Sequence, residues 1–371
     1  MTMTTTMPPA TSDETMRLAI STFRTRMAAA NKTFLQDRIN EITARDLPTE
    51  QARRDKLWQY RWMPCLGWWD DPPDRNTDVV VPKDTRFADL DASLVLKILP
   101  RYSPADGVLP SMLRTEEWRE MYIDTVQRIC QAQADKIAAE FDDDDEERLV
   151  IPRCDELALF VKYAGGVVDA DFRDSGIAGF EPAYLVGVRE EELAGLDEDQ
   201  RREKLADPAL FEREKERLDE LLNLDSEFEK MRVFIDEDLD VRAGFLTGTG
   251  YNRWLEYRMW YSAYVYCRLW TDEEEGEGKG YGNDEIEVEK EAPVQDADNI
   301  KEWGWRVVVF QAEGENPSVL YGRRPRFDTI PEFLEWYASW PDYMDARTLL
   351  SLRRRCVNCE TDCESDCEDH S

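Results

Sequence analysis

The sequence contains a single histidine, His370, the last residue but one of the 371. A Ser-His-Asp or Cys-His catalytic group needs a histidine base that a rigid frame holds within hydrogen-bond reach of the nucleophile. The end of an acidic tail is a poor frame of that kind, and a metal site built on three histidines is impossible with one. The composition therefore argues against histidine-based catalysis.

Long apolar runs are missing too. No segment reaches the roughly 18 apolar residues that a membrane-spanning helix needs. Residues 1–14 have neither the charged and then apolar pattern of a secretory signal nor the arginine-rich pattern of a transit peptide. We therefore expect a cytoplasmic protein, with the nucleus as the alternative. In that reducing compartment the 8 cysteines are thiols or metal ligands before they are disulfides.

Basic charge is scarce: 47 Lys and Arg face 80 Asp and Glu, for a formal net charge of −33 at pH 7. This balance argues against nucleic acid or an anionic membrane as partners and favours proteins with basic or apolar surfaces. A glycine-rich turn at Gly244, Gly248 and Gly250 lacks the Lys-Ser or Lys-Thr of a phosphate-binding loop. Acidic residues concentrate in four segments, expected to be solvated helix faces, flexible loops or docking surfaces: residues 142–147, 189–230, 271–291 and 360–371.

Apolar residues recur at helical spacing in the first 140 residues. Asp13 is expected to cap a first helix, whose apolar residues share one face: Met16, Ile20, Phe23 and Met27. The strongest pattern spans residues 115–140 and predicts an amphipathic helix that the acidic run at 142–147 ends.

Residue 149 begins a different pattern. A short helix ending near Tyr163 is followed by Gly165 and Gly166, which we expect to supply the positive φ of a sharp exit. Strands are expected where β-branched and aromatic residues cluster, at 167–168, 184–188, 232–235, 241–246, 256–270, 305–310 and 318–321. The strand at 256–270 should be central or part of a hairpin, because aromatic residues occupy both of its alternating faces.

Two helical segments accompany these strands. Residues 189–231 form a charged one, in which Asp207 and Pro208 suit the N-cap and first turn of a helix. Near the end, Thr329 and Glu332 have capping-box spacing. The apolar stripe that follows them predicts a helix packed across the sheet.

The order of these elements resembles the SUKH superfamily. The residues that carry the resemblance lie at the two ends of the segment 149–341: Ile151, Pro152, Leu157, Phe160, Gly165 and Gly166 at the front, and residues 305–310, 319–321, Phe327 and 330–334 at the back. The superfamily has a single α+β domain and includes fungal regulators of cell-wall synthesis and bacterial immunity proteins that bind toxins. The resemblance implies a binding or scaffolding role and carries over no catalytic residue.

We accordingly expect an α+β fold with a single mixed or antiparallel sheet, packed helices and a helical N-terminal extension. The expected organisation follows the changes of composition: a disordered tail at 1–13, the extension at 14–148, a SUKH-like domain at 149–351 with a charged insertion at 189–231 and an acidic loop at 271–300, and an acidic cysteine-rich tail at 352–371.

The cysteine tail is the most distinctive local feature and provides the candidate metal ligands: Cys356, Cys359, Cys363 and Cys367. On one helix the first and last would lie about 16 Å apart, so a single tetrahedral ion needs the helix to break. A disordered tail of reduced thiols, a zinc, copper(I) or iron–sulfur site, and redox cross-linking are the alternatives.

The expected function is therefore a non-enzymatic protein-interaction, scaffolding or regulatory protein of SUKH-like type, without a cofactor. One alternative is a metal-binding or redox protein organised on the C-terminal cysteines, with zinc as its metal. The other is a hydrolase that uses two carboxylates, because catalytic acids are recognised by burial and separation rather than by sequence.

Overall fold

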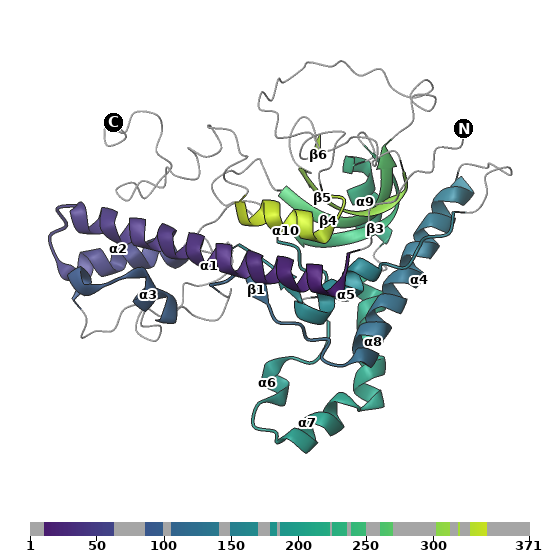
Figure 1. Cartoon of the computed structure of the whole chain (residues 1–371), viewed down its shortest axis with the longest axis horizontal. Helices are drawn as coiled ribbons and strands as arrows, with labels where there is room; N and C mark the ends of the chain where they lie inside the picture. Colours follow the sequence, from purple (N-terminus) through teal and green to yellow (C-terminus); the bar gives the residue numbers. More distant parts are fainter. Residues whose placement is uncertain are drawn as a thin grey trace, which may run out of the picture.

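The computed structural model describes residues 11–62, 86–98, 105–140, 149–169, 179–183, 186–222, 225–235, 239–249, 260–269, 302–311, 318–319 and 327–339. Helices and small antiparallel sheets combine in an α+β fold (Figure 1), which confirms the expected fold class.

The helices are α1 (Asp13–Ala44), α2 (Glu50–Trp62), α3 (Ala92–Ile98), α4 (Glu116–Glu140), α5 (Asp155–Tyr163), α6 (Glu190–Leu193), α7 (Glu198–Leu205), α8 (Pro208–Leu222), α9 (Asp225–Ile235) and α10 (Ile330–Ser339), with a 3-10 helix, η2, at Phe87–Asp89. Within the described ranges, none of these helices is both long enough and apolar enough to cross a membrane.

The main sheet has four antiparallel strands in the order β3-β4-β5-β6. They are β3 (Leu239–Thr249), β4 (Trp260–Leu269), β5 (Gly304–Gln311) and β6 (Ser318–Val319), and a separate pair joins β1 (Val108–Leu109) to β2 (Gly166–Val167). The central position of β4 confirms the prediction for residues 256–270 as far as they are described. The predicted hairpin of 305–310 with 318–321 is confirmed by the pairing of Phe310 with Val319.

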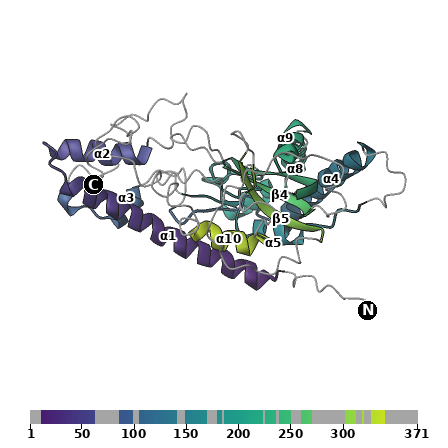
Figure 2. The same cartoon turned by 90° about the horizontal axis from the view of Figure 1, so that it is seen from above.

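Both faces of the sheet are covered. Alternate residues of a strand point to opposite faces, so Tyr264 and Tyr266 of β4 join the main core with α5 and α10, whereas Val265 and Cys267 join a second apolar cluster with α9. Figure 2 shows α10 and α9 on opposite sides of β4 and β5. The sheet is therefore the middle layer of the molecule.

Helix α1 joins two apolar clusters. Its first half adds Met16, Ile20, Phe23 and Met27 to the main core, beside α10, and its second half adds Leu35, Ile39 and Ile42 to a smaller cluster with α2, η2 and α3. Asn31 lies between the two groups, fully buried, and its Nδ2 donates to the carbonyl of Ala105 at 2.9 Å. Because a buried amide needs its partner, this bond fixes how α1 lies against the chain at Ala105.

The predicted N-cap of α1 was off by one residue. Ser12 is the N-cap, and its hydroxyl accepts the N–H of Thr15 at 3.1 Å. Asp13 is the first helical residue and bonds elsewhere, to Lys162 Nζ and to the hydroxyl of Tyr163, both at 2.6 Å. A carboxylate in the first turn still suits the positive end of the helix dipole.

Gly165 and Gly166 follow α5 as expected, but the expected reason was wrong. Neither has a positive φ, and the C-cap Ala164 is extended, with φ −147°. The need for glycine is spatial instead. A Cβ on Gly165 would lie 2.6 Å from the carbonyl oxygen of Pro110, and one on Gly166 would lie 2.8 Å from Cα of Glu181.

Two predicted strands are also corrected. Residues 232–235 end helix α9, whose Phe228, Met231 and Ile235 are buried at helical spacing while Val233 is 67% exposed. Residues 186–188, the described part of the predicted strand 184–188, form a bend in which Gly187 has φ +110°. In both places a short run with β-branched residues had suggested a strand. At 232–235 the packing of one helix face determines the structure, and at 186–188 the left-handed Gly187 does.

The charged segment 189–231 forms four helices. Asp207 and Pro208 begin α8 as predicted, with Asp207 Oδ1 accepting the N–H of Ala209 at 2.9 Å. Helix α8 packs on α4, but α6 and α7 extend away from the sheet (Figure 1), and α7 buries no residue. We call residues 189–222, helices α6 to α8, the charged arm.

The outer strand β3 is tied to α4 through one side chain. Its Gly244 has φ +154°, between two register shifts against β4, and its N–H donates to Oε1 of the buried Gln133 at 2.9 Å. A Cβ at this position would lie 2.7 Å from the carbonyl oxygen of Tyr264. Further along, the carbonyl of Thr247 accepts the N–H of Glu181 at 2.7 Å.

Candidate functional site

The predicted metal ligands lie outside the described residues: Cys356, Cys359, Cys363 and Cys367. Three other cysteines are described, and all are buried free thiols. Burial raises the pKa of Cys154 to about 12 and that of Cys267 to about 11. They are therefore protonated at neutral pH and behave as apolar core side chains rather than thiolate ligands.

Carboxylates gather at the start of α10. Glu156 belongs to the first turn of α5, Asp328 lies just before α10, and Glu332 lies in its first turn. Arg306 reaches the same place from β5. We call these four side chains the carboxylate cluster. Over the described ranges, no three His, Cys, Asp or Glu side chains are grouped so as to hold a metal ion.

Arg306 is the buried cation of the cluster, with its side chain only 5% exposed. Its Nε donates to Oδ1 of Asp328 at 2.7 Å, and its Nη2 donates to the carbonyl of Glu302 at 3.2 Å. Nη1 donates to the carbonyl of Cys267 on the neighbouring strand. A buried guanidinium with these partners joins β4, β5 and the segment that leads into α10.

Glu156 connects the starts of two helices. Its Oε1 accepts the hydroxyl hydrogen of Thr11 at 2.5 Å, next to the N-cap of α1. Its Oε2 accepts the N–H of Ile330, the first residue of α10, at 3.0 Å. Burial raises the pKa of this carboxyl above its usual value, although both hydrogen bonds oppose that shift.

Glu332 completes the predicted capping box. Its N–H donates to Oγ1 of Thr329 at 3.2 Å, and its carboxyl accepts from the backbone of Thr329 and Asp328. Burial, followed by the negative charges of Asp328 and Glu156, raises the pKa of Glu332 to about 7. The side chain therefore keeps its proton to a higher pH than an ordinary surface glutamate does.

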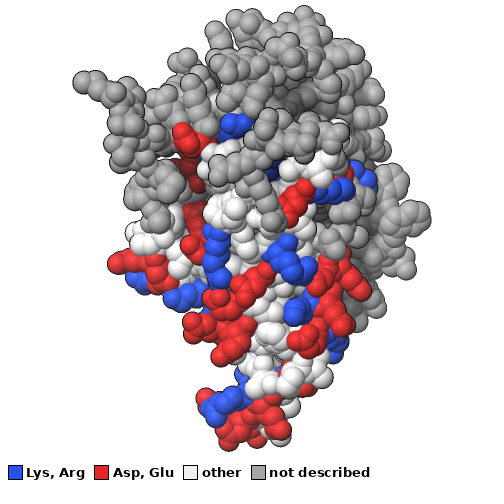
Figure 3. All heavy atoms as spheres, turned by 90° about the vertical axis from the view of Figure 1, so that its right-hand side faces the viewer, with Lys and Arg blue, Asp and Glu red and all other residues white. Residues whose placement is uncertain are grey.

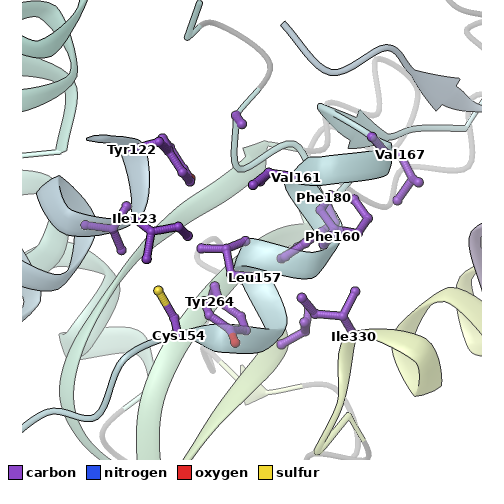
Figure 4. Close-up of a cluster of buried hydrophobic side chains, with 14 of the residues drawn as sticks. Tyr122, Ile123, Cys154, Leu157, Phe160, Val161, Val167, Phe180, Tyr264 and Ile330 are labelled. Atoms are coloured by element: carbon purple, nitrogen blue, oxygen red, sulfur yellow. The ribbon is translucent and has the colours of Figure 1, made fainter. Parts of the chain in front are cut away.

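Tyr264 of β4 lies beside the cluster. Figure 4 shows its ring between Cys154 and Ile330, beneath Leu157. The ring stacks on Trp305 with centroids 5.0 Å apart. The hydroxyl is fully buried and has no hydrogen-bond partner. Burial, and to a lesser degree the negative charge of Glu156, raises the pKa of Tyr264 well above the usual range.

Because an unpaired buried hydroxyl costs about 1–3 kcal/mol, Tyr264→Phe is expected to raise the free energy of unfolding by about 1 kcal/mol. Urea unfolding followed by circular dichroism measures the change. Tyr122 provides the matched control, since it is equally buried but donates to the carbonyl of Pro182 at 2.7 Å. Tyr122→Phe is expected to lose about 1 kcal/mol. Equal losses in both variants would contradict the assignment of an unpaired hydroxyl.

A second charged group lies at the same end of the sheet, where the start of β3 pairs with the end of β4. The buried Asp240 accepts from Arg242 Nε at 2.9 Å and from Arg268 Nε at 3.2 Å. Both guanidinium groups lie over the ring of Trp303, at 5.6 and 4.7 Å from its centroid, and Trp303 stacks on Tyr266. These contacts join the start of β3 and the end of β4 to Trp303, the residue just before β5.

The charged arm carries an excess of acidic side chains. Residues 189–222 contain 13 acidic and 7 basic side chains. Figure 3 shows acidic side chains gathered around the tip of the arm at the lower end of the view, with fewer basic ones among them. On α7 the basic residues pair locally, as between Arg202 and Asp199 at 3.3 Å.

Sequence reasoning identified Glu332 only as a cap and missed the rest of the cluster. Arg306 could have indicated the cluster, because it is a lone charge inside the apolar run Trp305–Val309. A buried cation in such a run requires an acidic partner. Nothing in the sequence separates Glu156 and Asp328 from the other acids, whose burial depends on the fold.

The chain was also compared with known proteins. Neither the scan against protein-family models nor the searches of curated proteins and of solved structures finds a match to this chain. The likeness to the SUKH superfamily therefore stays a prediction from the residues that carry it.

Proposed function

We propose that the protein is a non-enzymatic, SUKH-like interaction or scaffolding protein whose charged arm binds a protein partner with a basic surface. The observation that carries the proposal is the position of α6 and α7. They extend from the body (Figure 1), and α7 buries none of its residues. A helix that contributes no buried side chain adds little to folding stability. Helix α7 itself carries three acidic and three basic side chains, so the excess of acid belongs to the charged arm as a whole, whose surface is available for recognition.

The layers of the body support a binding role. Helices α5 and α10 cover one face of the sheet and α9 covers the other. In the carboxylate cluster, Glu156 and Asp328 accept hydrogen bonds from the protein itself, so these acids join elements of the fold. A carboxylate hydrolase instead needs two acids that face a substrate across a gap.

A variant with three fewer acidic side chains on α7 tests the proposal. Glu198→Gln, Asp199→Asn and Glu203→Gln together remove three exposed charges from α7 but leave the capping box of Asp197 and Gln200 intact. Partners are first recovered by affinity purification at low salt, and the dissociation constant of a stoichiometric partner is then measured by calorimetry. We expect the triple variant to bind about 10-fold more weakly and the unaltered protein to weaken as salt rises.

The matched control removes the same charge elsewhere: Glu14→Gln, Asp37→Asn and Glu116→Gln are exposed positions on α1 and α4. Its affinity should stay within about 2-fold of the unaltered protein. An equal loss in both variants would assign binding to the overall charge rather than to the arm. Purification that yields only the free monomer at low salt would count against a partner altogether.

A further inference from the structure

The charged arm is anchored to the body where the chain enters and leaves it. Just before the arm begins, a Cβ on Gly187 would lie 2.5 Å from the carbonyl oxygen of Met112, so the chain passes close to the body there. At the exit, α8 packs on α4 and adds Leu210 and Leu218 to the main core. The buried Glu214 of α8 connects the two places, because its Oε2 accepts the N–H of Gly187 at 3.5 Å. The base of the arm is therefore part of the folded body.

Helix α7, farther out, is held in another way. It has 8 residues and buries none of them fully, and a helix that short is unstable without support from its surroundings. Side-chain N–H groups that donate to backbone carbonyl groups before α7 and at its end supply that support: Trp118 Nε1 to Leu205 at 2.9 Å, Lys204 Nζ to Glu192 at 2.8 Å and Arg201 Nε to Leu196 at 3.1 Å. Hydrogen bonds, more than apolar packing, therefore determine where α7 lies.

Trp118 is the one of these three donors that belongs to the body. Arg201 and Lys204 connect parts of the arm with each other, whereas Trp118 lies in α4 and is only 1% exposed. Its ring also meets that of Phe211 in α8 edge-on, with centroids 5.2 Å apart. One buried side chain thus contacts the last residue of α7 and the first turn of α8, on either side of the turn between them.

We propose that Trp118 is a positioning residue for the charged arm: it sets the angle between α7 and α8 and so presents the surface of α7 to a partner in one preset orientation. This inference rests on the proposed function of the arm. A surface that is ordered before the encounter binds more tightly, because association does not have to order it. Trp118 itself lies beneath the arm and is too little exposed for a partner to touch.

Hydrogen exchange of the free protein, measured by mass spectrometry on the full chain, tests the positioning without a partner. Trp118→Phe keeps an aromatic ring in the core but removes the N–H that bonds to Leu205. We expect peptides from α7 to lose about 5-fold in protection, which corresponds to one hydrogen bond. Since α7 opens locally, this loss is separate from any general loss of stability, which appears in the slowest amides of β4.

Trp305→Phe is the matched control. The indole of Trp305 also donates to a backbone carbonyl, that of Pro152, at 2.9 Å, but it lies in β5 and stacks on Tyr264. This variant should leave the protection of α7 within about 1.5-fold of the unaltered protein. Equal losses in α7 in the two variants, or no loss in Trp118→Phe, would overturn the proposal.

Phe211→Leu takes the place of Trp118→Phe if that variant does not fold. It removes the edge contact but keeps the indole hydrogen bond, so α7 is expected to lose about 2-fold in protection. Unchanged protection of α7 in Phe211→Leu would then overturn the proposal.

Binding supplies a readout that a purely structural role of Trp118 would not produce. For the partner recovered at low salt, Trp118→Phe is expected to weaken binding about 3-fold, because a smaller fraction of the molecules holds α7 in the binding orientation. In the variant that already lacks the charges of Glu198, Asp199 and Glu203, the same substitution should have no further effect, since both changes act through one surface. Additive losses would overturn the proposal. If no partner is recovered, the proposed function fails, and the exchange of α7 still decides whether Trp118 positions the arm.

Discussion

Replacing Gly244 by alanine is expected to lower the free energy of unfolding by about 3–5 kcal/mol. The φ of +154° disfavours any side chain, and the new Cβ would lie 2.7 Å from the carbonyl oxygen of Tyr264 and 2.9 Å from Cα of Val265. These are backbone atoms of β4 that cannot turn aside, so the strands must separate. Urea unfolding followed by circular dichroism measures the loss.

The same substitution at Gly195 measures the cost of a positive φ without the cost of a close Cβ contact. It too has a positive φ, +79°, but a Cβ there would meet nothing within 4 Å. Gly195→Ala is therefore expected to lose only about 1 kcal/mol, which is the cost of the backbone conformation. A loss at Gly244 no larger than this would show that β3 can move away from β4 and would contradict the close approach.

Replacing Arg306 by leucine is expected to cost about 3–5 kcal/mol, because it removes one partner of a buried ion pair. Asp328 then stands beside Glu156 and Glu332 with no guanidinium, and the carbonyl groups of Glu302 and Cys267 lose a donor. The free energy of unfolding near pH 7, from urea titration, shows the effect.

Two further variants test whether that loss comes from the buried ion pair. Arg202→Leu removes the same charge from the exposed surface of α7, where the side chain is 71% exposed, and should change stability by less than about 0.5 kcal/mol. The double variant Arg306→Leu with Asp328→Asn should recover at least about 1 kcal/mol, since it also removes the unpaired carboxylate. If the double variant is no more stable than the single one, charge pairing is not what Arg306 contributes.

Elements with long periodic patterns could be predicted from the sequence. Helix α4 repeats its apolar residues over 25 positions, and strands β3, β4 and β5 are rich in β-branched and aromatic residues. In these segments local preference and burial favour the same structure. The capping box at Thr329 and Glu332 could also be predicted, because its two residues lie only three positions apart in the sequence.

Short segments were the ones misread. The run 232–235 suits a strand in isolation, but Asp225 begins a helix whose buried residues contact the second apolar cluster. For Gly165 and Gly166 the residue type was informative, although the reason, contact with Pro110 and Glu181, depends on chain that is distant in sequence. Contacts between distant segments leave no local pattern to read.

The carboxylate cluster could be predicted least. Its members lie at positions 156, 306, 328 and 332, and only the fold brings them together. With 80 acids in the chain, composition cannot single out the few whose burial changes their protonation. A lone arginine in an apolar strand is a usable signal for the cation, but it does not name its partner.

The contacts of β3 with Gln133 and Glu181 have a consequence beyond stability. The free side of an outermost strand is a template on which another chain can add, and many proteins guard it with charge, proline or a bulge. Here a side-chain amide from α4 and the backbone at residue 181 occupy two of the groups that an incoming strand would use. The architecture thus discourages edge-to-edge aggregation along β3 even where salt screens the repulsion between these acidic chains.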